Sequence, residues 1–492
     1  MVSAGTLALL ALPAGARAAE APPDATTTEP GVILVTANRR SEDVQKVATS
    51  IDVVSSTDLV ARNVQNVYGL QYVSPSLQVT PQFGSGQPAY QIRGVGFNDY
   101  ASNNAPAVGI YVDEVAYPIP FATNAAMFDV ERVEVLRGPQ GTLYGRNTTG
   151  GAINYIMNKP TRDFAAGAAL QYGRFDSIVG DAFLSGPLAD GVRFRIAGQV
   201  QGGGAWQHNR DTGEALGDVS RQALRGLLDV DASDRVTVRF GLHWSRDRSD
   251  AVGTYLLRPL TALHNKYPAL YPVYPADTRR DATGWGTTPQ FAAEIGIAPT
   301  TRPFSHIDTV GGSIRLDWDL GFATLTDLAS YDDASRTEYD NFDGSPRSVG
   351  DVFFDTDAWV AANELRLTSP DDGGPWRWVT GLYYAHQKLD DRYATGYLEL
   401  NGFDRNVTYR QIVDTVSLFG QVSYSVTPEL VLTGGLRLEY EKRELHDFAA
   451  FYIVNGAPTN PANVVPYRDT DFFEPSGKAQ IAYHFSDNDM AY

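Results

Sequence analysis

The sequence predicts a mostly β protein in which a transmembrane antiparallel β-barrel follows an N-terminal α/β domain. From Phe164 onward apolar and polar residues alternate with a period of two, as in the run VTVRFGLHW at 236–244. This alternation is typical of strands with one face against lipid and the other toward a wet or plugged lumen. The polar positions are rich in arginine, for example Arg193 and Arg195, which argues against a soluble β-sandwich.

The connections between these runs form the second observation, because short and long links alternate along the chain. Short periplasmic turns that alternate with long external loops are typical of an outer-membrane barrel. A soluble propeller or sandwich would not sort its loops so regularly. The short links lie near 188–191, 231–234, 320–321, 371–375, 427–429 and 486–489, and the long links near 203–217, 247–308, 337–356, 392–408 and 444–469.

The composition excludes other classes of protein. Mean hydropathy is -0.25, and no apolar run of 18 residues follows the N-terminus, which excludes a helical membrane protein. The net charge of -18 argues against a nucleic-acid partner, because few cations are available to neutralise phosphates. The chain has no cysteine, so neither disulfides nor thiolate metal sites can form.

The N-terminus has the pattern of an export signal. An apolar run at 7–12 precedes Ala16-Arg17-Ala18, so residues 1–18 are expected to be a signal peptide cleaved after Ala18. No basic residue precedes the apolar run, and we therefore expect the true start to lie upstream or the sequence to be clipped. Residues 19–49 are expected to form a flexible linker, because 19–30 (AEAPPDATTTEP) is rich in proline, threonine and acid.

The segment 128–160 (FDVERVEVLRGPQGTLYGRNTTGGAINYIMNKP) is the most informative part of the chain. It predicts a strand that breaks at Arg137, a glycine-rich loop, and a second strand at 152–157. Four glycines within eleven residues imply a tight turn or a close approach to another surface. The spacing of Gly141 and Gly145 does not fit a phosphate loop, and no nucleophile, base or metal ligand accompanies the glycines, so the segment is interpreted as architectural. Elsewhere Gly94-Val95-Gly96 begins a dinucleotide fingerprint, but Asp99 stands where the third glycine belongs. The distinctive residues of 128–160 are Arg137, Gly138, Pro139, Gly141, Tyr144, Gly145, Gly150 and Gly151.

This segment closely resembles the end of the plug domain of TonB-dependent outer-membrane receptors. Two further segments match plug motifs of that family: the strand ending in Arg93 and Gly94, and the strand ending in Asp113, after which Glu114 replaces the usual glycine. The resemblance implies a plug domain over 50–160, with the barrel over 164–492. We expect Arg93 and Arg137 to be paired with carboxylates, and no helix beyond Phe164.

The pentapeptide Ile33, Leu34, Val35, Thr36 and Ala37 resembles the TonB box of this family. An apolar segment on a flexible tether can add a strand to the sheet edge of a partner. The resemblance implies that the partner is TonB, acting with its inner-membrane energising complex. The alternative interpretation is that this segment is the first strand of the plug.

We count about twelve strands before the last turn at 486–489, whereas plugged outer-membrane transporters have about 22. Unpaired sheet edges are prohibitive in lipid. We therefore expect the sequence to be incomplete, lacking about ten strands. The alternative is a natural smaller barrel that ends in Tyr492.

No catalytic constellation or metal-ligand spacing is recognisable, so neither enzyme activity nor a cofactor is expected. The loop at 247–308 is the best candidate for substrate contacts, because it combines aromatic and arginine side chains that suit sugars or carboxylate-bearing iron chelates. The alternative is that these residues only pack the loop over the plug, and no substrate-binding residue is assigned. They are Tyr255, Tyr267, Tyr271, Tyr274, Trp285, Phe291, Arg258, Arg279, Arg280 and Arg302.

The family resemblance implies energy-coupled uptake across the outer membrane of a Gram-negative bacterium. A ferric siderophore is the commonest substrate of such receptors, while an oligosaccharide, cobalamin or another metal chelate remains open. A binding or adhesion barrel is an alternative of another class, although it would need neither the pentapeptide nor the N-terminal domain. A barrel enzyme would require a Ser/His/acid set, which we do not find.

Overall fold

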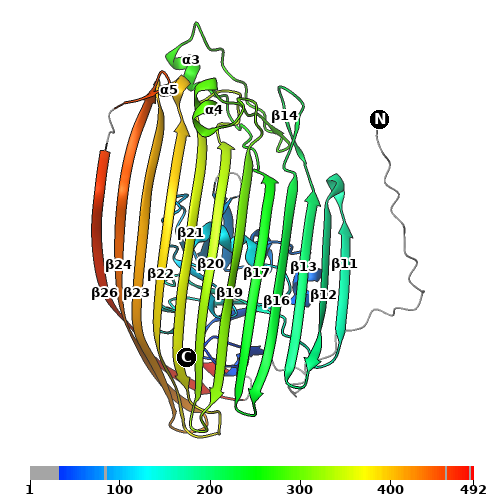
Figure 1. Ribbon diagram of the computed structural model, residues 1–492, viewed down its shortest axis with the longest axis vertical. Helices are drawn as coiled ribbons and strands as arrows, with labels where there is room; N and C mark the ends of the chain where they lie inside the picture. Colours follow the sequence, from blue (N-terminus) through cyan, green and yellow to red (C-terminus); the bar gives the residue numbers. More distant parts are fainter. Residues whose placement is uncertain (1–32, 83–85, 460–462, 487–488) are drawn as a thin grey trace, which may run out of the picture.

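The computed structural model describes residues 33–82, 86–459, 463–486 and 489–492. A large curved antiparallel sheet partly surrounds a smaller α/β domain (Figure 1). The expected signal peptide 1–18 and the first part of the expected linker, 19–32, lie outside the described residues. Within the described part of the chain, no helix is both long and apolar enough to span a bilayer.

The large sheet contains twelve long strands, each paired with its neighbour in chain order. This matches the count of about twelve expected before the last turn. Short β27 (Met490–Ala491) extends the sheet beyond them, and β25 (Ala457–Pro458) pairs with the last but one. The twelve are β11 (Ala165–Tyr172), β12 (Ile178–Ala189), β13 (Val192–Gly203), β16 (Val219–Ser233), β17 (Val236–Asp250), β19 (Phe304–Asp319), β20 (Thr324–Asn341), β21 (Asp351–Thr368), β22 (Trp376–Gly396), β23 (Asp404–Ser425), β24 (Leu430–Val454) and β26 (Asn463–His484).

Short turns gather at one end of the sheet and long connections at the other, as the sequence predicted (Figure 1). Three connections are shorter than expected, at 342–350, 397–403 and 455–462. The strands that flank them run up to 25 residues, as in β24. Above the bilayer these strands no longer face lipid, so the apolar alternation fades while the backbone ladder continues.

Four short helices occur beyond Phe164, so the expectation of none was wrong. They lie in connections: η4 (Arg174–Asp176), α3 (Ala262–Lys266), α4 (Pro289–Ile295) and α5 (Leu398–Asn401). Three residues of the sequence indicate the helix α4. Thr288 caps its N-terminus, Pro289 occupies the first turn, and Gly296 ends the helix at φ 78°. A small sheet joins two loops: β14 (Gln207–Asn209) and β15 (Ala215–Leu216) lie between β13 and β16, and β18 (Ala282–Thr283) lies in the long loop between β17 and β19.

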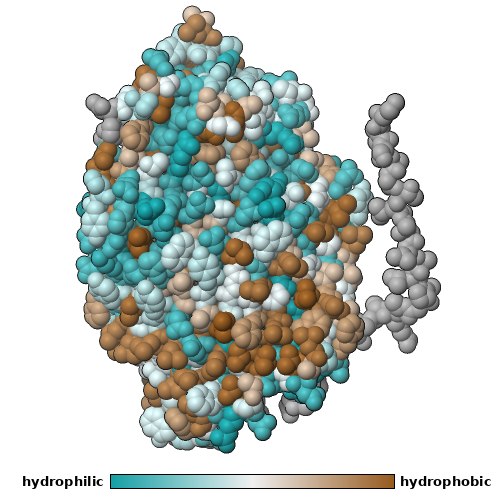
Figure 2. Space-filling view, in the orientation of Figure 1, coloured by the Kyte–Doolittle hydropathy of each residue, from teal (hydrophilic) through white to brown (hydrophobic). Residues whose placement is uncertain are grey.

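The outer face of the sheet carries a belt of hydrophobic side chains across its lower part (Figure 2). On β22 the exposed apolar residues run from Trp376 to Tyr384, a length that agrees with the roughly 9–11 residues of a tilted transmembrane strand. Trp376 stacks on Tyr424 with ring centroids 4.3 Å apart, and Tyr331 stacks on Trp359 at 5.9 Å. Aromatic residues at both edges of an apolar band are characteristic of transmembrane barrels.

The smaller domain contains a five-stranded mixed sheet in the order β3-β9-β10-β7-β8. Every residue of β10 is buried, because it lies between antiparallel β9 and parallel β7. A second sheet has the order β4-β5-β6, and four short helices complete the domain. The strands are β3 (Ile51–Ser55), β4 (Leu77–Gln82), β5 (Gln87–Ile92), β6 (Val95–Gly96), β7 (Val108–Val112), β8 (Val115–Ala116), β9 (Val130–Arg137) and β10 (Gly151–Met157), and the helices are α1 (Ser56–Ala61), η2 (Val67–Tyr72), η3 (Pro120–Ala126) and α2 (Gly141–Tyr144).

The belt makes a prediction about Leu382, which lies within it on β22 and is 53% exposed. We expect Leu382→Arg to destabilise the barrel by about 1–3 kcal/mol, because a guanidinium inside the apolar band is costly and the cost falls toward the edge of the band. Leu257→Arg is the control, since Leu257 is 68% exposed but lies in a loop, and it should change stability by under about 0.5 kcal/mol. Unfolding in lipid vesicles measures both, and equal effects would contradict the placement of the belt.

Candidate functional site

The glycine-rich segment contacts the wall of the barrel, as its composition suggested. Gly141 begins the single helical turn α2, and Gly145 ends it with φ 80°. A Cβ on Gly145 would lie 2.6 Å from the Arg437 guanidinium of the barrel, and one on Gly150 would lie 2.7 Å from the Val95 carbonyl oxygen. These two positions exclude larger residues because another group approaches the backbone closely.

The two arginines singled out from the sequence have different partners. Arg137 forms an ion pair with Asp52 and donates from Nε to Ser76 Oγ at 2.9 Å, so the expected carboxylate is confirmed. Arg93 donates to Ser50 Oγ at 3.0 Å and has no carboxylate partner among the described residues, so the expectation was wrong there. The side chain of Arg93 is exposed, and water can solvate its remaining donors.

Paired charges join the domain to the inner wall of the barrel. Asp129 accepts two hydrogen bonds from Arg195, at 2.5 and 2.8 Å, and Arg146 pairs with Glu441 at 2.6 Å. Buried arginines of this kind are tolerated only when a partner satisfies them. The domain therefore occupies the lumen as an electrostatic counterpart of the wall.

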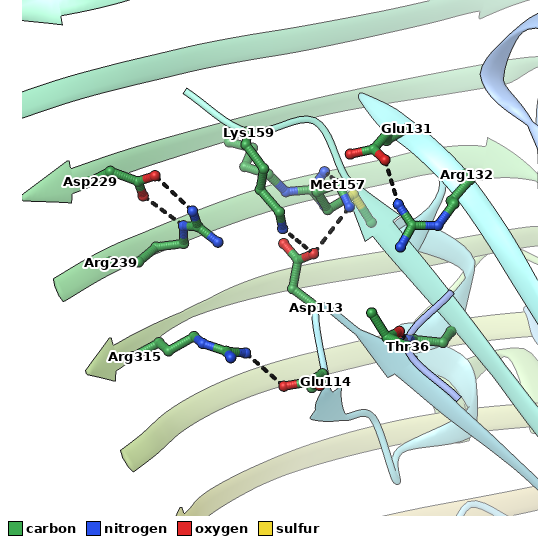
Figure 3. Close-up of polar contacts among 12 residues, drawn as sticks. Thr36, Asp113, Glu114, Glu131, Arg132, Met157, Lys159, Asp229, Arg239 and Arg315 are labelled. Atoms are coloured by element: carbon green, nitrogen blue, oxygen red, sulfur yellow. Dashed lines mark hydrogen bonds and ion pairs between the residues drawn. The ribbon is translucent and has the colours of Figure 1, made fainter. Parts of the chain in front are cut away.

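The turn between β7 and β8 contains the two acids Asp113 and Glu114, which reach in different directions (Figure 3). Asp113 stays within the domain and pairs with Lys159 at 2.5 Å. Burial would raise the pKa of Asp113, but the adjacent Lys159 ammonium holds the pKa below its ordinary value. Glu114 instead reaches the wall, where it pairs with Arg315 at 2.6 Å and Arg366 at 2.5 Å.

The N-terminal segment is docked on the domain rather than free. Leu34 and Val35 form β1 and pair with β2 (Glu42–Asp43), and the Val35 side chain is fully buried. The last residues expected in the flexible linker, 33–49, therefore belong to the packed structure and include η1 (Val44–Lys46). Arg40 hydrogen-bonds Ser369, which places the segment at the short-turn end of the barrel.

A buried carboxylate, Glu134 on β9, holds this segment. It accepts hydrogen bonds from Thr36 N at 3.1 Å and from Thr36 Oγ1 at 2.9 Å. Arg132 Nε also donates to Glu134, at 2.9 Å. Burial raises the pKa of Glu134, while Arg132 and the Thr36 donors oppose that rise. Asn154 and Tyr144 add further hydrogen bonds to Thr36.

The aromatic and arginine residues of the long external loop do not form one cluster. Trp285 and Phe291 are buried, and Phe291 packs with Tyr339 and Phe353 in a core that fixes α4 to the strand ends. Tyr274 stacks under Arg210 at 3.9 Å. Among the remaining arginines, Arg279 pairs with Asp277, Arg302 is shared between Glu214 and Asp250, and Arg258 and Arg280 are exposed.

An aromatic cluster that the sequence did not predict lies where the domain meets the external ends of the strands. Tyr100 of the domain lies 5.6 Å from Tyr393 and 6.3 Å from Phe354, measured between ring centroids. Tyr100 stands alone in a polar stretch, NDYASNN, so no periodicity indicated its role. Only the seating of the domain in the barrel brings the three rings together.

Comparisons with known proteins agree with this architecture. Residues 43–152 match the family model of the TonB-dependent Receptor Plug Domain. The pesticin receptor of Yersinia enterocolitica is 35% identical over 191 residues, covering 38% of this chain and 26% of the receptor. The iron-regulated outer membrane virulence protein of Vibrio cholerae is 28% identical over 252 residues, covering 47% and 36%. The chain thus spans between about a quarter and a third of the length of these relatives.

Solved structures show the same fold at low sequence identity. The ferric yersiniabactin uptake receptor of Yersinia pestis superposes with a TM-score of 0.71 at 19% identity, covering 89% of this chain and 62% of that one. A siderophore receptor of Acinetobacter baumannii gives 0.69 at 17% identity, covering 91% and 64%.

The fold is that of the plug-and-barrel class, with the plug segment seated against the inner wall of the large sheet. Residues 43–152 match the plug domain of TonB-dependent receptors, and the matched relative from Vibrio cholerae is named an outer membrane protein. The matched relatives and structures are named as receptors and transporters.

Glu134 provides a prediction about the docked segment. We expect Glu134→Ala to cost about 3–5 kcal/mol locally, because it removes a buried acceptor and leaves Arg132 and Thr36 without it. Hydrogen exchange of the Thr36 amide measures the cost. Glu131→Ala is the matched control, since Glu131 pairs with the same Arg132 but is much more exposed, and it should cost under about 1 kcal/mol. Equal protection of Thr36 in both variants would contradict the role of Glu134.

Proposed function

We propose that this protein is a TonB-dependent receptor that takes up a ferric chelate across the outer membrane. The observation that supports this most directly is the placement of two features at opposite ends of one plugged barrel. The pentapeptide 33–37 is docked at the short-turn end, and the long loops lie at the other end (Figure 1). A plug between them can couple capture of a solute outside to a pull from the periplasm.

The proposed partner is TonB, together with its inner-membrane energising complex, because the outer membrane has no energy source of its own. Strand addition to the pentapeptide would take its affinity mainly from backbone hydrogen bonds. In the docked state the Leu34–Val35 backbone already pairs with Glu42–Asp43. The partner therefore needs this short pairing to open before it can bind.

A ferric chelate is the proposed substrate class. By their names, several relatives and structural neighbours act on iron chelates, including a ferripyoverdine receptor of Pseudomonas aeruginosa that is 28% identical over 172 residues. The cluster of Tyr100, Phe354 and Tyr393 offers aromatic faces, and Arg405 lies on the same face of the sheet on the neighbouring strand β23. Aromatic faces beside guanidinium groups suit planar, anionic iron ligands.

Cobalamin is the second candidate, because a vitamin B12 transporter of Vibrio vulnificus is 27% identical over 215 residues. Uptake of radiolabelled iron from a panel of siderophores, compared with uptake of labelled cobalamin, separates the two. We expect iron uptake only, with Tyr393→Ala weakening binding of the chelate by about tenfold, since one stacked ring contributes about 1–2 kcal/mol. Uptake of cobalamin alone would overturn the substrate class.

The dependence of uptake on the pentapeptide tests the proposed coupling. We expect Leu34→Ala to weaken uptake modestly, because side chains contribute little to strand addition. Val35→Pro should nearly abolish it, because proline removes a ladder donor and fixes φ. Binding of substrate at the cell surface should persist in both variants, since capture occurs on the other side of the membrane.

The measurement is uptake and surface binding of labelled substrate in a strain that has only the variant receptor. Thr28→Pro is the matched proline control, because it precedes the pentapeptide in a stretch that already contains Pro22, Pro23 and Pro30, and it should leave uptake unchanged. If the Val35→Pro receptor is present at the cell surface at its normal level and takes up substrate normally, the assignment of residues 33–37 as the segment that binds TonB is wrong.

A further inference from the structure

Glu114 occupies a position that the family motif gives to glycine, and its backbone shows why glycine is usual there. Its φ is +73°, in the left-handed region that is strained for a residue with a Cβ. The side chain is nonetheless only 9% exposed. A strained, buried acid in a tight turn requires interactions that offset both penalties.

The interactions of Glu114 come from the barrel wall. Its Oε2 accepts from Arg315 Nη1 at 2.6 Å and from Arg366 Nη2 at 2.5 Å, and these arginines lie on β19 and β21. Burial alone would raise the pKa of Glu114, but the guanidinium groups of Arg366, Arg315 and Arg39 together hold the pKa well below its ordinary value. Glu114 therefore stays ionised through the neutral range.

The wall arginines do not depend on Glu114 alone. Arg315 also pairs with Asp317 at 2.6 Å, and Arg366 also pairs with Glu364 at 2.7 Å. Loss of the Glu114 carboxylate would therefore leave each of them one partner. What would be lost is the link between the plug and the two strands.

Arg39 connects this group to the N-terminal segment. It lies two residues after Ala37, pairs with Glu364 at 3.4 Å and donates from Nη1 to the Glu114 carbonyl oxygen at 3.3 Å. Its guanidinium lies over the Tyr144 ring at 4.5 Å, and its Nε has no partner among the described residues. The group contains three cations and three anions: Arg39, Arg315, Arg366, Glu114, Asp317 and Glu364.

We propose that these six residues, the Glu114 clasp, couple docking of the pentapeptide 33–37 to seating of the plug against β19 and β21. While Glu114 is in place, Arg39 is held between the plug turn and the wall, and β1 stays paired with β2. Movement of the turn at 113–114 away from the wall breaks both links together. Residues 33–37 then become available to the periplasmic partner. This last step rests on the proposed function, in which these residues bind TonB.

The alternative is that Glu114 only holds the plug against the wall and has no influence on residues 33–37. The two differ in one measurable quantity, the rate at which the buried Val35 side chain becomes accessible. These 492 residues contain no cysteine, so Val35→Cys introduces their single thiol, and the parent receptor without this change measures labelling of any other thiol. Its reaction with a maleimide in outer-membrane vesicles reports opening of the segment in the full-length receptor.

We expect Glu114→Gly to raise the labelling rate of the Val35→Cys thiol about tenfold or more, because a buried link is lost while the glycine relieves the strained turn. Arg39→Gln should have a similar effect. Combined, the two changes should give no more than either alone, because both act through one network. Asp231→Asn is the matched control, since it breaks an exposed pair with Arg193 on the barrel, and it should leave the rate within twofold of the parent.

Two further measurements keep the outcome unambiguous. Ile33→Cys, which is already 49% exposed, should label equally in every background and so reports access of the reagent. Resistance of the barrel to SDS confirms assembly, and Glu114→Gln replaces Glu114→Gly if the latter does not assemble. A Val35→Cys rate unchanged by Glu114 and Arg39 variants, or additive effects of the two, overturns the clasp.

The result is separable from the test of uptake. Unchanged labelling together with loss of uptake in Val35→Pro would reject the clasp and keep the proposed function. Faster labelling together with normal uptake in Val35→Pro would keep the clasp and reject the role of the pentapeptide.

Discussion

The pairing of inward-facing arginines is the interaction on which the rest of this structure depends. Strand geometry points every second side chain into the lumen, and there the wall carries buried guanidinium groups that lipid could never accommodate. The plug supplies acids and carbonyl oxygens to several of them, such as Asp129 for Arg195, Glu114 for Arg366 and the Phe128 carbonyl for Arg225. The plug therefore completes the hydrogen bonding of several wall arginines, and the wall in turn satisfies buried acids of the plug.

The same requirement explains why the plug can be both firmly held and movable. Individual bonds are short, but they are distributed along the wall and many involve a second partner on the barrel itself. Arg315 and Arg366 each keep a wall carboxylate when the plug turn moves. The wall is thus preorganised to survive loss of plug contacts, which a lumen lined with unpaired arginines could not do.

The barrel could be predicted from the sequence because the requirement that one face of each strand meet lipid produces a local alternation with a period of two residues. Runs such as 236–244 indicate which face of a strand meets lipid, and Gly145 and Gly150 indicate that the backbone closely approaches another surface.

The ends of the long strands were harder to predict, because above the bilayer water replaces lipid and the alternation of apolar and polar residues fades. The docking of residues 33–37 could not be predicted from the sequence. An apolar pentapeptide has the same sequence pattern whether it binds another protein or Glu134 of its own chain. Glu114 was noticed as a departure from a motif, but its partners lie some 200 and 250 residues away in sequence, and no local pattern links them.

The order of strands in the plug sheet has a consequence for how the chain is made and exported. The central strand β10 is the last plug strand in the sequence, yet it joins β9 on one side to β7 on the other. The five-stranded sheet therefore cannot be completed until residue 157 has been delivered, and the pairing of β3 with β9 and of β7 with β10 bridges long separations, which slows folding. A chain that crosses the inner membrane from its N-terminus thus remains extended while the plug is in transit. The plug acquires its central strand only as the first barrel strand arrives, so the two parts are free to fold in each other's presence.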